Sequence, residues 1–440
     1  MAVDRSTSAT ALAGARPAGR TPREAARLVQ QRHARMVGAV VAAVVLVLLA
    51  MRIELPQGLT VGYVLAAILV PLWLPVLRRY RGARLLLVVG LLAVGSGLWL
   101  TQSFAGTRET SLGQTVTLSV GLVGILCGIG FLLWCRTVLP DAQVAFWFGV
   151  GLLIGVTPSS ELYLANPWRF GYSVALTIIV LALARQTGRR WLELAAVLGF
   201  TVIAAFTDAR SAFAILLLTA LLVLWQMRPG HRTRTTSAAR VILVIVALAA
   251  VVYAVGQALI LDGALGQETQ LRSDAQLQTS GSLILGGRPE LAATAALMLH
   301  QPFGFGAGTI PNGDDILAAK AGLSRIGYDP NNNYVDVYLF GGHIELHSVV
   351  GDLWAWFGLA GLVLAGLIVA VVLTAIASRV AGGTASAVVV YLAVKLLWAM
   401  LFGPLYSSAT LIILAIGLVL VRRPDPYPAD PHPADAVARG

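Results

Sequence analysis

"HIELHSVVGDLWAWFGLAGLVLAG", residues 343–366, places two histidines and two acidic residues at the mouth of a long apolar run. An apolar run of this length is typical of a membrane-spanning helix. Ionisable groups at the edge of a bilayer are costly, and they usually face protein or water rather than lipid. The stretch therefore predicts a membrane helix that starts beside a functional, water-accessible cluster.

The whole chain has the composition of a membrane protein. Of its 440 residues, 57% are hydrophobic and 12% are charged, whereas a typical soluble domain has about 25% charged residues. The formal net charge is +11, but the basic residues occur in short bursts between apolar runs. This pattern favours anchoring of loops at a membrane surface over binding of nucleic acid. We predict an all-α polytopic membrane protein without a nucleic-acid partner.

Apolar segments recur along the chain at lengths suited to a bilayer. A spanning helix needs roughly 17–25 mostly apolar residues, and we expect about twelve such helices. The predicted spans are 37–51, 58–77, 85–101, 115–135, 143–157, 169–184, 192–207, 211–227, 241–261, 347–376, 385–402 and 406–421.

Arginine placement orients these spans. The basic segments "RRYRGAR" (78–84), "RQTGRR" (185–190) and "RPGHRTRTTSAAR" (228–240) fall on one side of the membrane, and cytoplasmic loops carry the excess of Lys and Arg. We therefore expect a multi-pass protein of the cytoplasmic membrane with both termini in the cytoplasm. The predicted organisation is a disordered basic cytoplasmic tail (1–36), transmembrane helices 1–9 (37–261), an extracytoplasmic loop domain (262–346), transmembrane helices 10–12 (347–421) and a cytoplasmic tail (422–440).

The connection 262–346 stands apart because it is too polar to span and too long for a turn. Loops of this length are usually functional or disordered. Leu291, Leu297 and Met298 indicate an amphipathic helix that ends before Pro302. We expect one large, partly helical loop outside the cell. No internal repeat is obvious, which disfavours a transporter with duplicated halves.

Two arginines are candidates for binding a phosphate group. Arg210 interrupts the apolar stretch "TDARSAFAILLL", and Arg288 precedes Pro289 in "GGRPE". A guanidinium binds phosphate through paired hydrogen bonds. The alternatives are a snorkelling Arg210 paired with Asp208, and a solvated loop arginine at position 288. The glycine-rich turn "GFGAG" is a weak signal for a phosphate cradle, and it makes Gly304, Gly306 and Gly308 candidate substrate-binding residues.

His347 is the candidate general base, because imidazole exchanges protons near neutral pH. The alternative is a histidine that caps the following span. His343 and Glu345 alternate with His347 and would share its face on a strand, whereas on a helix His343 and His347 would be one turn apart. Asp352 lies inside the span, where a charge needs water or a cation nearby. We take His343, Glu345 and Asp352 as candidate substrate-binding residues. The HExxH order of zinc proteases is absent, and we predict no metal site.

Three segments together resemble one family. His347-Ser348, nine further residues and then Gly358-Leu359-Ala360-Gly361 resemble the H-[NSQ]-x9-G-x-x-G signature of the O-antigen ligase and polymerase superfamily. Residues 286–308 look like that family's segment from a Gly-Arg pair to alternating glycines, and "TDARSAFAILLL" is similar to its outer arginine motif. The resemblance covers most of residues 37–421.

This resemblance implies a GT-C-like membrane glycosyltransferase that inverts the sugar and uses no metal or other cofactor. The donor would be a glycan on a polyprenyl pyrophosphate such as undecaprenyl pyrophosphate. Arg210 and Arg288 would bind the pyrophosphate, and His347 would deprotonate the acceptor hydroxyl. The active site would be extracytoplasmic, among membrane lipids. A ligase acting on a glycan, lipid or protein acceptor is the first expectation, and a polymerase that extends the lipid-linked glycan is the second. A twelve-helix transporter or flippase is the third.

Overall fold

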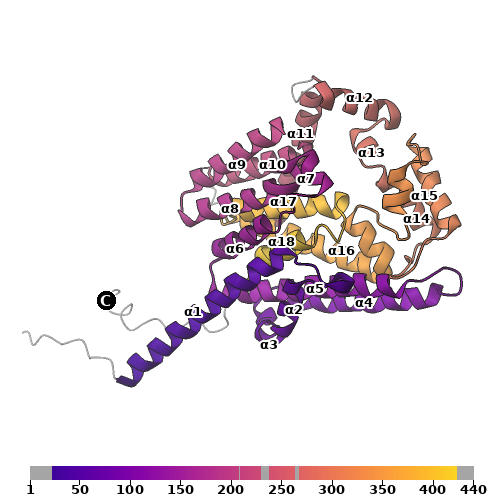
Figure 1. Cartoon of the computed structure of the whole chain (residues 1–440). Helices are drawn as coiled ribbons and strands as arrows, with labels where there is room; N and C mark the ends of the chain where they lie inside the picture. The colour runs from indigo at the N-terminus through magenta and orange to yellow at the C-terminus, as the bar shows by residue number, and fades with distance from the viewer. Residues whose placement is uncertain (1–21, 208, 229–236, 263–266, 424–440) are drawn as a thin grey trace, which may run out of the picture.

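The computed structural model describes residues 22–207, 209–228, 237–262 and 267–423, and these residues form a helical bundle (Figure 1). Apart from isolated β-bridges, no β-structure occurs among them. The predicted all-α class is therefore confirmed. Residues 1–21 and 424–440, where most of the two tails were expected, lie outside the described residues.

Helices follow one another closely along the chain. The first half contains α1 (Pro22–Met51), η1 (Pro56–Gly58), α2 (Val61–Ile68), α3 (Val70–Trp73), η2 (Pro75–Arg79), α4 (Ala83–Phe104), α5 (Leu112–Val138), α6 (Asp141–Ile154), α7 (Glu161–Ala165), η3 (Trp168–Tyr172), α8 (Ser173–Gln186), α9 (Arg190–Phe206), α10 (Arg210–Gln226) and α11 (Ala238–Leu261). The second half contains α12 (Gln267–Ser280), α13 (Leu283–Gly287), α14 (Glu290–His300), α15 (Gly313–Arg325), η5 (Tyr334–Leu339), α16 (Val349–Ala381), α17 (Ala387–Phe402) and α18 (Ala409–Val419).

Each of the predicted spans coincides with helix, but not every helix has the length of a full span. By length and apolar composition, 6 helices in the described part of the chain are able to cross a membrane, or 7 if a bent pair counts as one span. Four further apolar helices are shorter: Asp141–Ile154, Arg210–Gln226, Ala387–Phe402 and Ala409–Val419. The chain therefore has the helices of a membrane protein, and twelve spans remain a prediction.

Two expectations about the N-terminal part were wrong. Helix α1 begins at Pro22, so residues 22–36 are helical where the disordered tail was expected to continue. The predicted span 58–77 is not one helix, because the pieces Val61–Ile68 and Val70–Arg79 are bent by 58°. Pro71 and Pro75 lie in the second piece. Proline cannot donate to the helical hydrogen-bond ladder, which explains the break.

The basic segments meet at one end of the bundle. The backbone N–H of Arg423 donates to the carbonyl of Arg79 (2.7 Å). The Arg190 guanidinium donates to the carbonyls of Gly383 (2.7 Å) and Ala385 (2.8 Å), just after α16. Helix ends leave carbonyls unpaired, and these arginines satisfy them. The segments 78–84, 185–190 and 377–384 and the chain after α18 therefore share one end of the described molecule, and residues 229–236 of the remaining basic segment lie outside the described residues.

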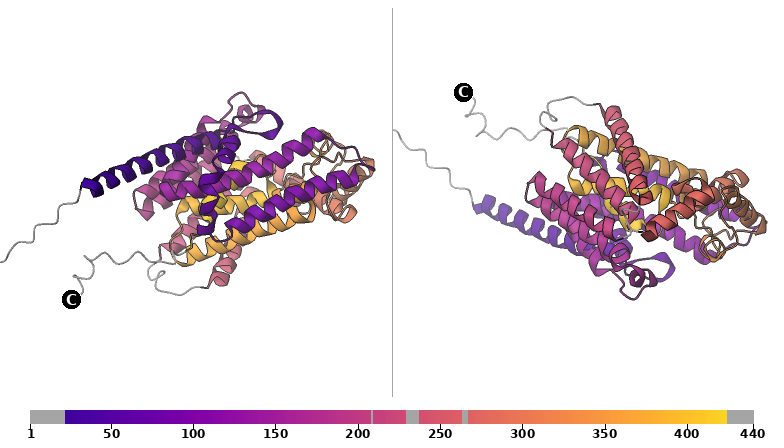
Figure 2. Two further views of the ribbon diagram at one scale, coloured as in Figure 1. Left: turned by 90° about the horizontal axis from the view of Figure 1, so that it is seen from below. Right: turned by 90° about the horizontal axis from the view of Figure 1, so that it is seen from above.

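Helices α12 to α15 lie at the other end, opposite the start of α1 (Figures 1 and 2). The predicted helix after Pro289 is present as α14, although its buried face carries Ala293, Thr294 and Leu297. A buried ion pair ties α15 to the α4–α5 connection: Arg108 donates two 2.8 Å hydrogen bonds to Asp315. These helices are thus anchored on the bundle.

The charge on Asp315 is supported from several sides. Burial raises the pKa of this carboxyl, but the Arg108 hydrogen bond, the backbone N–H of Asn312 and the charge of Arg108 together outweigh burial and lower it. The side chain of Asp315 is fully buried and that of Arg108 is 9% exposed. Breaking a buried pair by removing one partner costs roughly 3–5 kcal/mol. The anchor is therefore a strong constraint on the position of α15.

The "GFGAG" turn fills a break in α16. Gly358 has φ 63° and ψ −149°, so the helix is interrupted there. Ala355 lies one turn earlier, and its carbonyl accepts hydrogen bonds from the N–H groups of Phe305 (2.8 Å) and Gly306 (3.0 Å). A left-handed φ of this kind favours glycine. The glycine of the family signature therefore creates the gap into which the loop inserts.

The close approach of the loop also explains its own glycines. A Cβ on Gly304 would lie 2.4 Å from the carbonyl of Trp354, and one on Gly306 would lie 2.5 Å from the amide of Thr101. The N–H of Gly308 donates to the Thr101 hydroxyl (3.0 Å). Backbone thus packs on backbone, and this packing holds the loop between α4, α5 and α16.

A Gly306→Ala substitution tests this packing. We expect a loss of roughly 2–4 kcal/mol of stability, because the new Cβ overlaps α4 and the backbone is in a strained region. Gly306 has φ +109°, whereas Gly313 has open space around its Cα. Thermal unfolding in detergent micelles should show early melting for Gly306→Ala and a melt close to wild type for Gly313→Ala. Equal melting of both variants would contradict the close approach.

Candidate functional site

A buried carboxylate organises the start of α16. Asp352 is 0% exposed. One of its oxygens accepts from the N–H of Leu346 (2.7 Å), and the other accepts from the N–H of Leu405 (2.8 Å). Asp352 therefore joins the segment before α16 to the turn after α17. It was expected to contact substrate, but its oxygens face backbone amides, which makes it a positioning residue.

Ser348 supports the same junction. Its hydroxyl oxygen accepts from the N–H of Gly351 (3.2 Å) and so caps α16, and its O–H donates to the carbonyl of Met400 (3.0 Å) near the end of α17. Serine is a preferred residue at this helix position. The Ser and the His of the family signature are neighbours, so the cap fixes the backbone next to His347.

His347 lies between these two constraints in a strained conformation. Its φ is 49°, in the left-handed region, which costs a residue with a side chain roughly 1–2 kcal/mol. The ring lies 5.6 Å from the Tyr334 ring, centroid to centroid. Its Nδ1 is buried and has no hydrogen-bond partner among the described residues. Strain of this kind is found at functional sites, and a buried ring nitrogen without a hydrogen-bond partner is a second unusual feature of this side chain.

Arg288 is connected to this histidine through two side chains. Arg288 Nη1 donates to Glu290 Oε1 (3.4 Å), and the Tyr334 hydroxyl donates to Glu290 Oε2 (3.2 Å). Burial, followed by the charge and hydrogen bond of Glu290, raises the pKa of Tyr334, so the phenol stays protonated. The structure thus brings Arg288 and His347 into one cluster, hereafter the Arg288–His347 cluster, made of Arg288, Glu290, Tyr334 and His347.

Local structure explains the position of Arg288. Pro289 directly precedes α14, and Glu290 is the first residue of that helix. Proline is favoured at a helix start, and an acidic residue there complements the helix dipole. The guanidinium carbon lies 5.9 Å from the centroid of the Phe402 ring at the end of α17. Arg288 is therefore held between α14 and α17.

Arg210 contacts α12, and α12 in turn contacts the segment before Arg288. It is the first residue of α10, and its Nη1 donates to the hydroxyl of Ser273 in α12 (2.9 Å). One turn later in α12, the carbonyl of Gln276 lies 2.7 Å from the position of a Cβ on Gly286. α12 thus spans from Arg210 to the segment that carries Arg288. Asp208, the alternative partner of Arg210, lies outside the described residues.

His343 and Glu345 form a pair of their own. His343 Nε2 lies 3.5 Å from Glu345 Oε2. The hydrogen bond to Glu345 raises the pKa of His343 against the opposing effect of burial. No strand forms over 343–348, so the expected common face with His347 is not observed. The His347 ring packs on Tyr334 instead, and the sequence pattern grouped side chains that the fold separates.

The glycine-rich turn is not a phosphate cradle in this structure. Gly304, Gly306 and Gly308 are buried, and their amides donate to Gln301, Ala355 and Thr101. A phosphate cradle requires free N–H groups directed at the ligand. The three glycines were expected to bind substrate, and their observed role is packing.

Trp354 and Trp356 are anchors of the loop. Their indole N–H groups donate to the carbonyls of Pro302 (3.0 Å) and Ile344 (2.6 Å). Both rings are almost fully buried. They hold segments before α16 in place and do not offer an open face to a sugar.

Sequence patterns missed Glu290 as a partner and Tyr334 altogether. Tyr334 occurs in "NNNYVDVYL", which carries no spacing typical of a site. Both residues enter the cluster only through contacts between α14, η5 and the start of α16. An acidic residue two positions after a candidate arginine was the one available signal.

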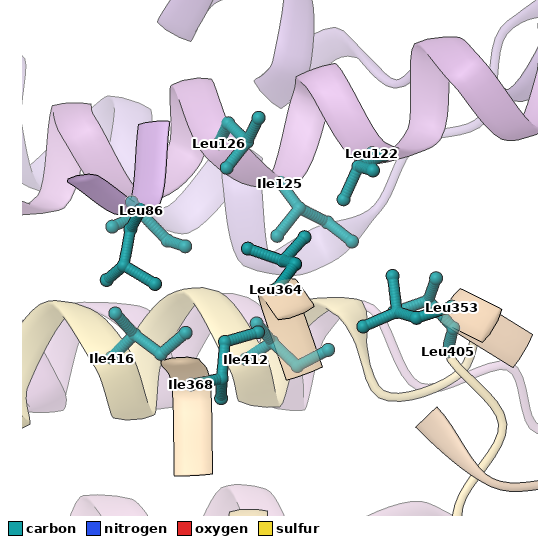
Figure 3. Close-up of a pocket in the computed structure, with 11 residues that line it drawn as sticks. Leu86, Leu122, Ile125, Leu126, Leu353, Leu364, Ile368, Leu405, Ile412 and Ile416 are labelled. Atoms are coloured by element: carbon teal, nitrogen blue, oxygen red, sulfur yellow. The ribbon is translucent and has the colours of Figure 1, made fainter. Parts of the chain in front are cut away.

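The small cavity between α4, α5, α16 and α18 is entirely apolar (Figure 3). Its wall is made of Leu86, Leu122, Ile125, Leu126, Ile129, Leu353, Leu364, Ile368, Leu405, Ile412 and Ile416. It offers no polar group to a phosphate or a hydroxyl, so it is not the site of the chemistry. Among the described residues, no group of three or more His, Cys, Asp and Glu side chains is placed to hold a metal ion.

An Asp352→Asn substitution tests the junction at α16. The amide keeps one acceptor oxygen, so either Leu346 or Leu405 is left with a buried, unpaired N–H, at a cost of roughly 1–3 kcal/mol. We expect a lower unfolding temperature in detergent micelles. Asp336→Asn is the matched control, because Asp336 is half exposed and pairs with Lys320 on the surface. Unchanged melting of Asp352→Asn would show that the carboxylate does not hold the junction.

The chain matches no protein-family model, no curated protein and no solved structure. The family resemblance therefore rests on the three motifs, and the activity that it implies is a proposal.

Proposed function

We propose that the protein is an O-antigen ligase-like membrane glycosyltransferase. It transfers a glycan from a polyprenyl-pyrophosphate donor to a hydroxyl of a glycan, lipid or protein acceptor, at the outer face of the cytoplasmic membrane. The observation that carries the proposal is the Arg288–His347 cluster. It joins a guanidinium and an unpartnered imidazole that are far apart in the sequence.

Arg288 binds the donor pyrophosphate in this proposal. Its guanidinium makes one long hydrogen bond, to Glu290, and no other hydrogen bond within the described residues. The remaining N–H groups match the oxygens of a phosphate. Cleavage of a sugar–pyrophosphate bond leaves negative charge on the pyrophosphate, and a preorganised cation stabilises that charge. Arg210, connected through α12, supplies a second positive charge.

His347 acts as the general base for the acceptor hydroxyl. A ring nitrogen takes the proton from the acceptor hydroxyl while the hydroxyl oxygen forms a bond to the anomeric carbon. The bond from that carbon to the pyrophosphate oxygen breaks, and the electron pair leaves with the pyrophosphate. Attack opposite the leaving group inverts the sugar. A positioned base contributes typically 10²–10⁴-fold to such a step.

The end of the bundle that carries the cluster is opposite the end that carries the basic segments. The positive-inside rule assigns the basic end to the cytoplasm, which puts the cluster on the outer side. A lipid-linked donor fits this position, because its polyprenyl chain lies in the bilayer beside the bundle and its pyrophosphate lies at the surface. The candidate polar groups gather at one end, whereas a transporter is expected to hold them near the bilayer midplane.

The single large connection between α11 and α16 favours a ligase over a polymerase that extends the lipid-linked glycan. Both reactions use the same donor and the same bond changes, and they differ in the acceptor. The lipid extract of a strain without the gene identifies the donor, because the unused polyprenyl-linked glycan accumulates there.

A His347→Ala substitution tests the reaction. We expect at least a 100-fold loss of transfer, within the typical contribution of a general base, with normal amounts of protein in the membrane. In the deletion strain, plasmid-borne wild type should clear the accumulated lipid-linked glycan, and His347→Ala should not, as measured by mass spectrometry of lipid extracts. His300→Ala is the control, since it also removes an imidazole, but one that contacts Asp315 and does not belong to the Arg288–His347 cluster. Full clearance by His347→Ala would rule out the general base.

The orientation is tested by cysteine labelling. Ser324 is exposed on α15 and Ser237 is exposed before α11, whereas the native Cys127 and Cys135 are buried. A membrane-impermeant maleimide should label Ser324→Cys in intact cells and Ser237→Cys only after permeabilisation. The opposite pattern would place the cluster in the cytoplasm and end the proposal of an extracytoplasmic donor site.

A further inference from the structure

Glu290 is the central residue of the Arg288–His347 cluster. Its side chain is 2% exposed, and its two oxygens have different partners, Arg288 and Tyr334. A carboxylate that is buried to this degree needs a positive charge or several donors to remain ionised. Within the described residues Arg288 is the cation that contacts it. The Arg288–Glu290 pair is therefore balanced, with one negative and one positive group.

An anionic ligand at Arg288 changes this balance. A pyrophosphate carries at least two negative charges near neutral pH, and it would occupy the same guanidinium that now contacts Glu290. Like charges at short distance in a poorly solvated site disfavour the ionised form of one partner. In the part of the chain that the structure describes, the groups that face Glu290 include no second cation. They are the guanidinium of Arg288 and the phenol of Tyr334, with Tyr328 and His347 next to that phenol.

The hydrogen bond between Arg288 and Glu290 is weak enough to be replaced by a bond to an anionic ligand. Charge-assisted hydrogen bonds of an arginine are typically about 2.7–2.9 Å long and often paired, but Arg288 and Glu290 share a single bond of 3.4 Å. The carboxylate thus orients the guanidinium without using its paired N–H groups. Phosphate oxygens are able to form the shorter, paired contacts that Glu290 does not form.

We propose that Glu290 is the internal counter-ion of Arg288, which the donor pyrophosphate replaces, and that the Glu290 carboxylate takes up a proton from solvent when this happens. The inference rests on the proposed function and adds a positioning residue to it. Before the donor binds, Glu290 keeps Arg288 near Phe402. In the occupied site the neutral carboxyl still accepts from Tyr334, so the packing of Tyr334 on His347 is retained.

The test uses inorganic pyrophosphate as the probe and the purified full-length protein in detergent micelles. Isothermal titration calorimetry in two buffers of different ionisation enthalpy gives both the affinity and the number of protons taken up. For Glu290→Gln we expect about 5- to 10-fold tighter binding, where tenfold corresponds to about 1.4 kcal/mol, because the competing charge is absent. The proton uptake of wild type should exceed that of this variant, since protonation of pyrophosphate itself cancels in the difference.

Two further variants separate charge from shape. Glu290→Asp keeps the charge, so it should keep the proton uptake and bind pyrophosphate more weakly than Glu290→Gln. Asp336→Asn removes a carboxylate from the same helical turn as Tyr334, but one that pairs with Lys320 instead. Its affinity should stay within about twofold of wild type, as expected for an exposed charge pair.

The outcomes distinguish the inference from the function on which it rests. Unchanged or weaker binding by Glu290→Gln, or loss of the proton uptake in Glu290→Asp, would overturn the counter-ion role and leave the donor site intact. Arg288→Gln should abolish binding of pyrophosphate. Binding at wild-type strength by Arg288→Gln, or no binding by wild type, would overturn the donor site, and the counter-ion role with it.

Discussion

The Asp352 carboxylate is the constraint on which the candidate site depends. By accepting from Leu346 and Leu405, it fixes the chain on both sides of the α16–α17 pair. The Ser348 cap completes the junction, and His347 lies between these two contacts in a left-handed conformation. A buried carboxylate with two amide donors is costly to remove. The position of the imidazole is thus set by backbone contacts that do not themselves take part in the chemistry.

A second constraint is the break in α16 at Gly358. The interrupted helix leaves the Ala355 carbonyl to the "GFGAG" turn, and the loop domain is held where a continuous helix would have excluded it. The Arg108–Asp315 pair anchors the same domain from the other side. Glycines that resembled a ligand-binding motif therefore act as points of close packing. They bring α14 and η5, and with them Glu290 and Tyr334, to the N-terminal end of α16.

The arrangement supports two separate chemical functions, the binding of an anion and the transfer of a proton. Arg288 offers N–H groups to an anion, and the unpartnered His347 ring offers a site for a proton. Glu290 and Tyr334 lie between them and join the two. In a glycan transfer the leaving pyrophosphate and the acceptor hydroxyl need these two functions on opposite faces of one sugar. A cluster that carries both is consistent with the proposed transfer.

The sequence by itself determined the helical class and the apolar segments, because these follow from local composition and from the cost of charge in a membrane. It also singled out His347, Arg288, Arg210 and Asp352 as candidate site residues. Only the tertiary structure decided which neighbours matter. Alternation grouped His343 and Glu345 with His347, and the glycines suggested a cradle. Contacts between distant segments replaced both ideas with Glu290 and Tyr334 and gave Asp352 a positioning role, since no local pattern encodes a hydrogen bond between helices that are far apart in the chain.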